Sequence, residues 1–335
     1  MSELIITSKD DVEYLITLDI NDVEIGAKYF HWGLGSVRED DTLYFGRVMG
    51  SPVSGHSIEQ IQKALERVPS EDIFPPLPIP WWFSHTGVTV AESWDAEPDL
   101  DVYYLKRPWI ARLEAPGRPR EVAMWFAHEV KQLERLARHP SHPNLVRYHG
   151  CRVRNGRITG ALLARVPGEN LWGYLQAGKT VDKDRFVAAL ASAVDHLHNV
   201  VGLVHNDIHP GNIVVSPNGM PTLIDLGSSY PDGEEMTLWI PFSCWGGDPL
   251  DMDPETYYDG PRTASPTSRK SRDLAALKQL RIWLDNPIDP WTTTISRQRV
   301  DASEYFVEVS NRRNQEAVAR HKASIKAAKD NETAA

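Results

Sequence analysis

The sequence predicts an α+β fold in which strand-like segments and amphipathic helices occupy different parts of the chain. Residues 12–20 and 42–48 are rich in β-branched and aromatic side chains, which is typical of strands. Residues 182–200 instead repeat their apolar side chains near the 3.6-residue period of a helix. Because strand-like segments dominate the first half and helical segments the second, an α+β architecture is favoured over a regular alternation of the two.

Composition and charge narrow the class of protein. The chain has 335 residues, of which 41% are hydrophobic and 24% charged, as in ordinary globular proteins. This length allows two domains, or one two-lobed domain with an extension. The net charge of −10 argues against broad nucleic-acid binding, which needs a basic surface to neutralise phosphates, so no nucleic-acid partner is expected. With only Cys151 and Cys244, no disulfide framework is predicted and a reducing compartment is favoured.

The first ten residues contain no basic region leading into an apolar run, so a secretory signal is not expected. No apolar run of the sequence is long enough to span a bilayer. We therefore expect no membrane partner and a cytoplasmic location, with the nucleus as the alternative.

Residues 1–75 are predicted to form an N-terminal β-rich extension, whose role the sequence does not indicate. Residues 57–67 favour a helix that Ser57 can cap. The proline-rich run at 74–80 then interrupts regular structure and marks a domain boundary.

Further elements are expected along the rest of the chain. The sequence predicts strands at 87–94, 102–106 and 161–164, a loop at 116–120, and helices at 121–139, 182–200, 271–284 and 302–329.

The most informative motif is formed by residues 205–213 and 223–227. Asp207 is followed by Asn212 five residues later, and by Asp225 thirteen residues after that. Phosphoryl transfer needs a carboxylate beside the incoming hydroxyl and hard oxygen ligands for Mg²⁺ beside the nucleotide phosphates. Asp207 can supply the carboxylate, and Asn212 and Asp225 can supply the ligands.

These two segments, H-N-D-I-H-P-G-N and D-L-G, resemble the catalytic loop and the metal-binding turn of the protein kinases. The resemblance implies a two-lobed protein-kinase-like fold, with a small lobe and hinge at 76–166, a large lobe at 167–335, and ATP and Mg²⁺ between them. It also implies that Asp207 is the catalytic residue and that Asn212 and Asp225 bind the metal.

Lys106 ends an apolar strand-like run and resembles the kinase lysine that holds the α- and β-phosphates. Glu129 lies in a helical stretch that is followed by H-P-N-L-V at 142–146, which resembles the regulatory helix of the family. The resemblance therefore implies an ion pair between Lys106 and Glu129. A solvated lysine at a strand end is the alternative for Lys106, and Glu134 is the rival carboxylate on the same helix.

The resemblance extends to the hinge and to the large lobe. Leu163 takes the gatekeeper position, and Ala164 to Val166 the hinge, whose backbone would bind adenine. Asp273 resembles the buried aspartate that braces the catalytic loop, although a helix N-terminus also favours such an acid. Residues 253–255 are a weak match to the A-P-E motif that closes the activation segment.

Several departures from the family pattern bear on function. The glycine-rich loop is reduced to Gly87, which leaves fewer backbone amides for the phosphates. Asn206 replaces the arginine of H-R-D, so switching by a phosphate on the activation segment is not expected. His209 replaces the usual lysine, and H-x-D-I-H-P-x-N also occurs in small-molecule phosphotransferases of the aminoglycoside and choline kinase type. The chain after Trp283 is short, so an abbreviated large lobe is expected.

A zinc site and a basic surface for lipid or nucleic acid are less favoured as functions of this chain. His196, His198 and His205 lack cysteine or acidic partners at zinc spacing, which favours core or solvated histidines. Basic residues of the tail alternate with Glu316 and Asp330, which favours a solvated helix face over a surface for lipid or nucleic acid.

Three functions remain open, in order of preference. The first is an ATP- and Mg²⁺-dependent Ser/Thr-type protein kinase, which transfers the γ-phosphate to a hydroxyl. The second is a small-molecule kinase, so the acceptor is a protein or a small-molecule hydroxyl. The third is a pseudokinase that acts as a binding or scaffold protein, in which the pair of Lys106 and Glu129 should be broken or the nucleotide pocket filled.

Overall fold

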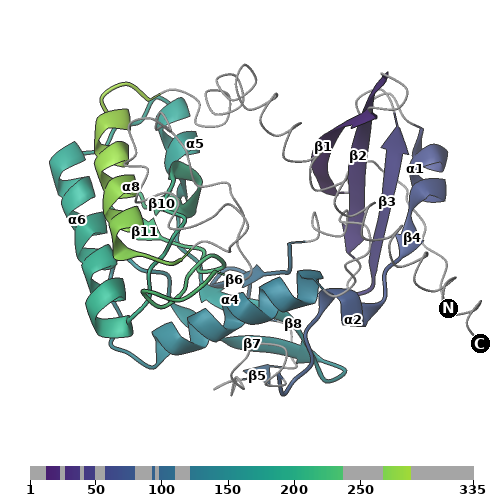
Figure 1. The fold of residues 1–335 in the computed structure, drawn as a ribbon, viewed down its shortest axis with the longest axis horizontal. Coiled ribbons are helices and arrows are strands. Elements are labelled where there is room, and N and C mark those ends of the chain that lie inside the picture. Colours follow the sequence, from purple (N-terminus) through teal and green to yellow (C-terminus); the bar gives the residue numbers. More distant parts are fainter. Residues whose placement is uncertain are drawn as a thin grey trace, which may run out of the picture.

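The computed structural model describes residues 13–22, 27–37, 41–49, 57–79, 93–94, 98–109, 121–236 and 267–287. Their strands form three sheets, and helices flank these sheets (Figure 1). Mixed helix and sheet in this arrangement confirm the predicted α+β fold class.

The first sheet belongs to the N-terminal extension and is antiparallel throughout. Its strand order is β1 (Glu13–Asp22), β2 (Ala27–Val37), β3 (Leu43–Met49) and β4 (Glu66–Arg67). The strands expected at 12–20 and 42–48 are therefore confirmed. Strand β2 was not predicted, because Gly33 and Gly35 weaken the strand pattern of its sequence.

A short helix packs closely on this sheet. Helix α1 (Ile58–Ala64) begins after Ser57, whose side chain accepts a hydrogen bond from the Gln60 N–H in a capping box, as predicted for a cap. A Cβ atom at Gly46 of β3 would lie 2.0 Å from the Ala64 carbonyl oxygen. Only glycine at position 46 therefore allows the end of α1 to approach the strand so closely.

The second sheet carries Lys106. Its order is β5 (Ser93–Trp94), β7 (Tyr148–Arg154), β8 (Arg157–Ala164) and β6 (Tyr103–Lys106). Strand β6 lies antiparallel to β8, with Lys106 opposite Ala161. The strands expected at 102–106 and 161–164 are confirmed, and β8 is longer than predicted. Strand β7 was not predicted, although Asn155-Gly156 is a strong hairpin signal, and both residues have positive φ.

Only the end of the strand expected at 87–94 lies within the described residues. Ser93 and Trp94 pair in parallel with Cys151 and Arg152 of β7, at the edge of the sheet opposite β6. Gly87, the loop expected at 116–120, residues 253–255 and the tail helix expected at 302–329 lie outside the described residues.

Helix α4 (Glu121–Ala137) confirms the long helix expected at 121–139 and runs beside the second sheet (Figure 1). Its buried face includes Phe126, Val130 and Leu133, which are spaced three or four residues apart, as one face of a helix requires. Helix α4 contacts β7, and this contact places Glu129 beside the sheet that carries Lys106.

The large lobe is mainly helical. Its described helices are α5 (Leu171–Gln176), α6 (Lys183–His196), the π-helical turn η4 (Leu197–Val201), the 3₁₀ turn η5 (Pro210–Asn212) and α8 (Lys270–Trp283). Its small sheet has the order β11 (Pro221–Leu223), β10 (Ile213–Val215) and β9 (Glu169–Asn170). The helices expected at 182–200 and 271–284 are confirmed, the first as α6 continued by η4.

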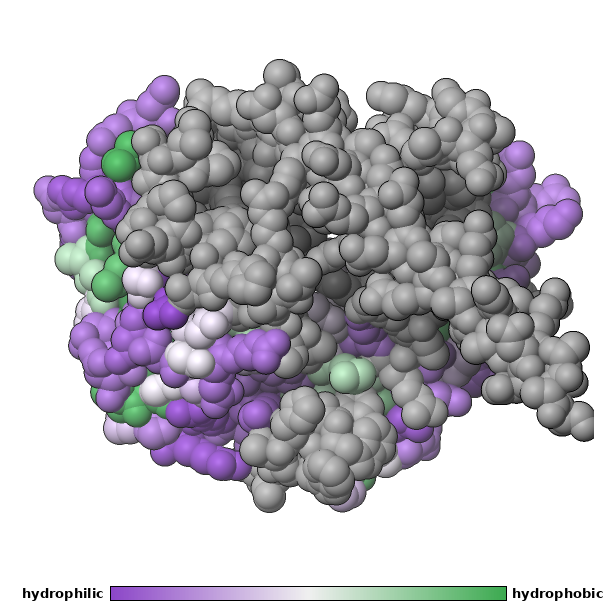
Figure 2. Space-filling view, in the orientation of Figure 1, coloured by the Kyte–Doolittle hydropathy of each residue, from purple (hydrophilic) through white to green (hydrophobic). Residues whose placement is uncertain are grey.

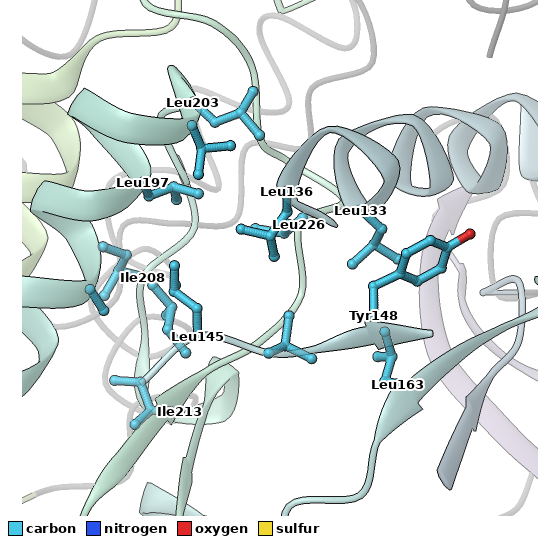
Figure 3. Close-up of a cluster of buried hydrophobic side chains, with 14 of the residues drawn as sticks. Leu133, Leu136, Leu145, Tyr148, Leu163, Leu197, Leu203, Ile208, Ile213 and Leu226 are labelled. Atoms are coloured by element: carbon cyan, nitrogen blue, oxygen red, sulfur yellow. The ribbon is translucent and has the colours of Figure 1, made fainter. Parts of the chain in front are cut away.

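One hydrophobic core joins the second sheet, α4 and the large lobe. Figure 3 shows part of it, in which Leu226 points toward Leu136 at the end of α4. Leu226 directly follows Asp225, and it is 1% exposed. Packing of Leu226 in this core therefore fixes the chain segment that carries Asp225.

The described surface in Figure 2 is largely hydrophilic, with single apolar residues between polar ones. In the part of the chain that the structure describes, no helix is both long and apolar enough to cross a membrane. The division of the chain at 75/76 and 166/167 stays a prediction.

Candidate active site

The catalytic loop is held by the buried carboxylate of Asp273, in the first turn of α8. The backbone N–H groups of His205 and Asn206 donate to its Oδ2 and Oδ1 at 2.7 and 2.8 Å. His198 Nε2 lies 2.8 Å from Oδ2. Asp273 is 1% exposed. A position at a helix N-terminus does not by itself require such burial. Asp273 therefore acts as the brace of the loop, meaning that its carboxylate fixes the loop backbone through these hydrogen bonds.

Hydrogen bonds within the loop orient Asp207. Asn212 Nδ2 donates to the backbone oxygen of Asp207 at 2.9 Å and to its Oδ2 at 3.2 Å. The N–H of Asp207 donates to His205 Nδ1 at 3.3 Å. His205 Nε2 in turn lies 3.0 Å from the carbonyl oxygen of Ile224, next to Asp225. The loop and the Asp225 segment are thereby fixed to each other.

Lys106, Glu129 and Asp225 meet although they come from β6, α4 and the segment after β11. Lys106 Nζ lies 2.5 Å from Glu129 Oε1 and 2.9 Å from Asp225 Oδ1. The rival carboxylate, Glu134, instead accepts a hydrogen bond from the Tyr148 hydroxyl at 2.7 Å. Lys106 is therefore no solvated strand-end lysine in this structure.

Opposing effects set the pKa values of this cluster. Desolvation alone would lower the pKa of Lys106, but the carboxylates of Asp225 and Glu129 outweigh it and raise this pKa. Burial likewise works against ionised Asp225, yet Lys106 and the Gly227 N–H lower the pKa of Asp225 to about 2. Burial raises the pKa of Glu129, with Lys106 opposing. Asp225 is therefore anionic at neutral pH, as a metal ligand must be.

Asn212 and Asp225 form a donor set that suits Mg²⁺. The N–H of Ile224 donates to the backbone oxygen of Asn212 at 2.9 Å, which ties the two positions together. Because Asn212 Nδ2 is used by Asp207, its Oδ1 is the atom left to bind a cation. Two protein oxygens are few, but Mg²⁺ is typically held by one or two carboxylates together with substrate phosphates and water.

Asp225 has φ of 67°, in the left-handed region that few residues other than glycine adopt. Its Oδ1 accepts a hydrogen bond from the Gly227 N–H at 3.0 Å, which supports the turn. A substitution at this position must therefore tolerate left-handed backbone, as asparagine does.

The hinge follows β8. Leu163, at 5% exposure, lies opposite Tyr104 of β6. The N–H of Ala164 donates to the Arg147 carbonyl oxygen at 2.8 Å, and that of Arg165 to the Val102 carbonyl oxygen at 2.9 Å. Among the described residues of the hinge, the N–H of Val166 therefore remains for a nucleotide base.

The chain turns away from the hinge at Gly168, which has φ of 148°. A Cβ atom there would lie 2.1 Å from the Val215 carbonyl oxygen of β10. Glycine is thus required at this position, because the turn passes directly over the strand that leaves the catalytic loop.

Tyr104 borders the site and was not predicted. It is two residues before Lys106, so strand alternation puts it on the same face of β6. It is 52% exposed, although it is aromatic. The period of two along β6 was the signal that could have identified it.

His128 is a second residue that the sequence did not single out. It lies on α4 next to Glu129, and its Nε2 lies 2.9 Å from the Ser229 carbonyl oxygen. Its ring also stacks on Tyr230 at a centroid distance of 4.3 Å. Burial lowers the pKa of His128 to about 4, so the ring is neutral at pH 7. His128 thus joins α4 to the segment after Asp225.

Asn206 has a structural task at the position of the kinase arginine. It is 5% exposed and has φ of 63°. Its Nδ2 donates to Ser268 Oγ at 2.9 Å and to the Ser228 carbonyl oxygen at 3.2 Å. The amide therefore ties the catalytic loop to residues on both sides of the activation segment.

His209 lies close to Asp207. Its Nδ1 accepts a hydrogen bond from the Gly211 N–H at 3.0 Å, so a neutral ring carries its proton on Nε2. This Nε2 lies 3.7 Å from Asp207 Oδ1. His209 therefore borders the space above the predicted catalytic carboxylate.

The histidines for which a metal role was considered contact protein oxygen atoms. His198 and His205 are buried and hydrogen bonded to Asp273 and Ile224, and partly exposed His196 lies 2.9 Å from the Pro140 carbonyl oxygen. Within the described ranges, no cluster of histidine, cysteine or acidic residues could hold a metal by itself.

Comparison with known families agrees with this geometry. Residues 118–237 match the family model of the protein kinase domain. This part of the chain is similar to the protein kinase domain. The matched range contains Glu129, Leu163, Asp207, Asn212 and Asp225, whereas Lys106 lies before it and is brought to the site by β6.

Curated protein kinases also match part of the chain. The Serine/threonine-protein kinase CHK1 of Saccharomyces cerevisiae is 31% identical over 121 residues, which is 35% of this chain and 23% of the relative. Mitogen-activated protein kinase kinase kinase 2 of Arabidopsis thaliana is 31% identical over 122 residues, 36% of this chain and 18% of the relative. Aurora kinase A-A of Xenopus laevis is 28% identical over 116 residues, 33% of this chain and 28% of the relative. The chain spans less than a third of the length of these relatives.

Proposed function

We propose that this chain is an ATP- and Mg²⁺-dependent phosphotransferase of the Ser/Thr protein kinase type, which transfers the γ-phosphate to a hydroxyl group. The observation that carries the proposal is the position of Lys106 Nζ, 2.5 Å from Glu129 and 2.9 Å from Asp225. A lysine held between these carboxylates, beside a metal-ligand pair, matches the needs of nucleotide phosphates.

Each residue of the cluster has a role in this proposal. Lys106 binds the α- and β-phosphates, and Glu129 orients its ammonium group. Asn212 and Asp225 hold Mg²⁺, which neutralises phosphate charge when it is bound. Asp207, oriented by Asn212, accepts the proton of the attacking hydroxyl and directs its oxygen at the γ-phosphorus.

The base is proposed to bind at the hinge, between the backbone of Ala164 to Val166 and the side chains of Leu163 and Tyr104. The free N–H of Val166 supplies a donor there, and the ring of Tyr104 supplies apolar surface. Gly87, expected to contact the phosphates, lies outside the described residues and keeps that role as a proposal.

An intact pair of Lys106 and Glu129 favours an active enzyme over a pseudokinase. Burial of a lysine against two carboxylates costs desolvation free energy, and binding of nucleotide phosphates gives a reason to retain this arrangement. The side-chain exposures of Lys106 and Glu129 are 20% and 8%. The cluster therefore supports retained phosphoryl transfer.

His209 favours a small-molecule acceptor as the second candidate function. It lies beside Asp207, at the position where the small-molecule phosphotransferases also carry histidine. The two candidates differ in the groove expected along 225–255, and residues 237–266 of the chain lie outside the described residues. The acceptor must therefore be identified by experiment.

The test is purified protein with ATP and Mg²⁺, measured for autophosphorylation, for transfer to Ser/Thr peptides and for ATP consumption with a panel of metabolite alcohols. Transfer to peptides supports the first candidate, and transfer to one class of metabolite alone supports the second. Failure of all acceptors to take up phosphate contradicts the proposed activity.

Binding provides a separate test of the nucleotide site. Asp225→Asn keeps the left-handed backbone and removes the charge, so Mg²⁺-dependent ATP binding in calorimetry should be lost. The matched control is Asp195→Asn, because Asp195 is an exposed acid on α6. Unchanged MgATP binding by Asp225→Asn would favour the pseudokinase interpretation.

A further inference from the structure

The N-terminal extension reaches the strand of Lys106 through one buried carboxylate. Asp41 is 5% exposed, and its Oδ1 accepts hydrogen bonds from Arg107 and Arg152. Arg154 Nε lies 3.8 Å from its other oxygen. Arg107 directly follows Lys106, and Arg152 is in β7. Asp41 therefore binds two strands of the sheet that presents the phosphate-binding lysine.

A second contact joins the extension to the helix of Glu129. Val122, in the first turn of α4, is buried in a separate hydrophobic cluster with Leu43, Ile73 and Phe74. In Figure 1 the short helix α2 (Ser70–Ile73) lies at the N-terminal end of α4. Val122 precedes Glu129 by two helical turns, so this cluster fixes the same helix that pairs with Lys106.

The link that follows these contacts in the chain, residues 74–77, is itself attached to the hairpin of β7 and β8. The N–H of Ile158 donates to the Pro75 carbonyl oxygen at 2.9 Å, and the N–H of Leu77 to the Gly156 carbonyl oxygen at 2.8 Å. Arg157 Nη1 donates to the Phe74 carbonyl oxygen at 2.9 Å. Because the link is hydrogen bonded along its length, it is fixed to the sheet and does not act as a free tether.

The geometry points to a positioning role for residues 41–49 and 57–79. We infer that Asp41 and the cluster around Val122 hold β6 and α4 at the separation that the pair of Lys106 and Glu129 requires. Strand β6 is an edge strand of four residues and α4 is a separate helix, so their relative position needs support from a third element. This role rests on the proposed function, because the pair matters when it orients nucleotide phosphates.

The contacts of Arg107 allow this role to be separated from a contribution to stability. Arg107 is 33% exposed, and Arg152 remains to neutralise Asp41 when Arg107 is changed. A partly exposed ion pair adds little to global stability. Its removal should therefore disturb the position of β6 more than the folding of the protein.

The experiment compares full-length Arg107→Gln with the wild type and with the control Arg281→Gln. Arg281 forms an exposed ion pair with Asp184 in the large lobe, 2.6 Å apart. Amide hydrogen exchange should become about tenfold faster across residues 121–137 of Arg107→Gln and stay unchanged at 205–215. Its MgATP affinity should fall about fivefold or more, whereas Arg281→Gln should change neither quantity.

Local readouts decide between positioning and general stabilisation. Faster exchange confined to α4 and β6, with weaker MgATP binding, supports the inference. Unchanged exchange in α4, or a uniform increase that includes the large lobe, overturns it. If the wild type does not bind MgATP, the proposed function fails, and the exchange pattern still decides whether the extension holds α4.

A second variant, Asp41→Asn, tests the carboxylate itself. It keeps the shape of the side chain and removes the charge that neutralises buried Arg152, so its exchange in α4 should exceed that of Arg107→Gln. Exchange in α4 equal to that of the wild type would overturn the role of Asp41.

Discussion

The two sides of the candidate site are built by different means. The floor is the catalytic loop at 205–212, a continuous stretch whose backbone is hydrogen bonded to one buried carboxylate, Asp273. The roof is formed by Lys106 and Glu129, which are 23 residues apart on a strand and a helix and are joined by an ion pair. The floor is thus local and hydrogen bonded, whereas the roof depends on how separate elements are placed.

This difference has physical consequences. Removing the buried carboxylate of Asp273 leaves the backbone N–H groups of the loop without an acceptor. Changes at Asp273 should therefore mainly lower the free energy of unfolding. Lys106 of the roof keeps 20% of its side chain exposed, and the roof is supported from the extension, so damage there should appear mainly as weaker nucleotide binding. Changes on the two sides should therefore separate these measurements.

The largest effect is expected from Asp207→Asn in the floor. Phosphoryl transfer should fall about a thousandfold or more, because the proton acceptor that positions the hydroxyl is removed. The affinity for MgATP should change by less than about twofold. Steady-state kinetics and calorimetry measure the two quantities, and a variant with full activity would show that another group is the catalytic carboxylate.

Asp273→Ala should reveal the brace. The free energy of unfolding should fall by about 3 kcal/mol, because the N–H groups of His205 and Asn206 lose a buried charged acceptor. Urea unfolding measures this loss, with Asp184→Ala, an exposed acid on α6, as the control. If the free energy of unfolding fell only as much as in the control, Asp273 would be an ordinary acidic residue at a helix N-terminus.

Lys106→Met tests the roof. Activity should fall about a hundredfold or more, since an electrostatic contact with the phosphates is removed. Unlike Asp207→Asn, this variant should also bind ATP more weakly, because Lys106 contributes to ground-state binding. The control is Lys179→Met, whose lysine pairs with Glu169 in the large lobe. Normal ATP affinity and most of the rate in Lys106→Met would remove Lys106 from the site.

Acidification should weaken the contact that joins roof and floor at His128. The folded protein holds the pKa of His128 at about 4, below its ordinary value, so the unfolded chain binds more protons between these values. The stabilising contribution is therefore complete above pH 6.5 and is lost as the pH falls, by about 2 kcal/mol at pH 5. Urea unfolding at several pH values should show a smaller slope for His128→Gln. An identical slope would show that other titratable groups determine it.

The smallest effect is expected from phosphatase treatment. Asn206 is neutral, and its amide already donates to Ser268 and Ser228, so no phosphate is needed to hold the floor. The rate of transfer should stay within about twofold of the untreated protein. A tenfold loss of the transfer rate corresponds to about 1.4 kcal/mol of barrier. It would mean that a cationic side chain other than residue 206 binds a phosphate group on the protein.

The residues of the floor could be identified from the sequence because their spacing is local. Asp207 and Asn212 lie in one loop, and Asp225 follows after a short hairpin, so chain connectivity alone keeps them close. The cap at Ser57 and the helix 121–139 were likewise legible, since capping and helical periodicity depend on neighbouring residues. Strands β2 and β7 were missed because glycines and charged residues obscure their alternation.

The tertiary structure alone decided which distant groups meet. The sequence suggested Lys106 with Glu129 through a family resemblance, but their contact with Asp225 depends on the packing of α4 between the second sheet and the segment after Asp225. Nothing in the sequence indicated that Asp41 binds Arg107 and Arg152, because charges far apart in the chain have no local signature. Local patterns set the elements and the catalytic loop, whereas burial and long-range ion pairs set the roof of the site.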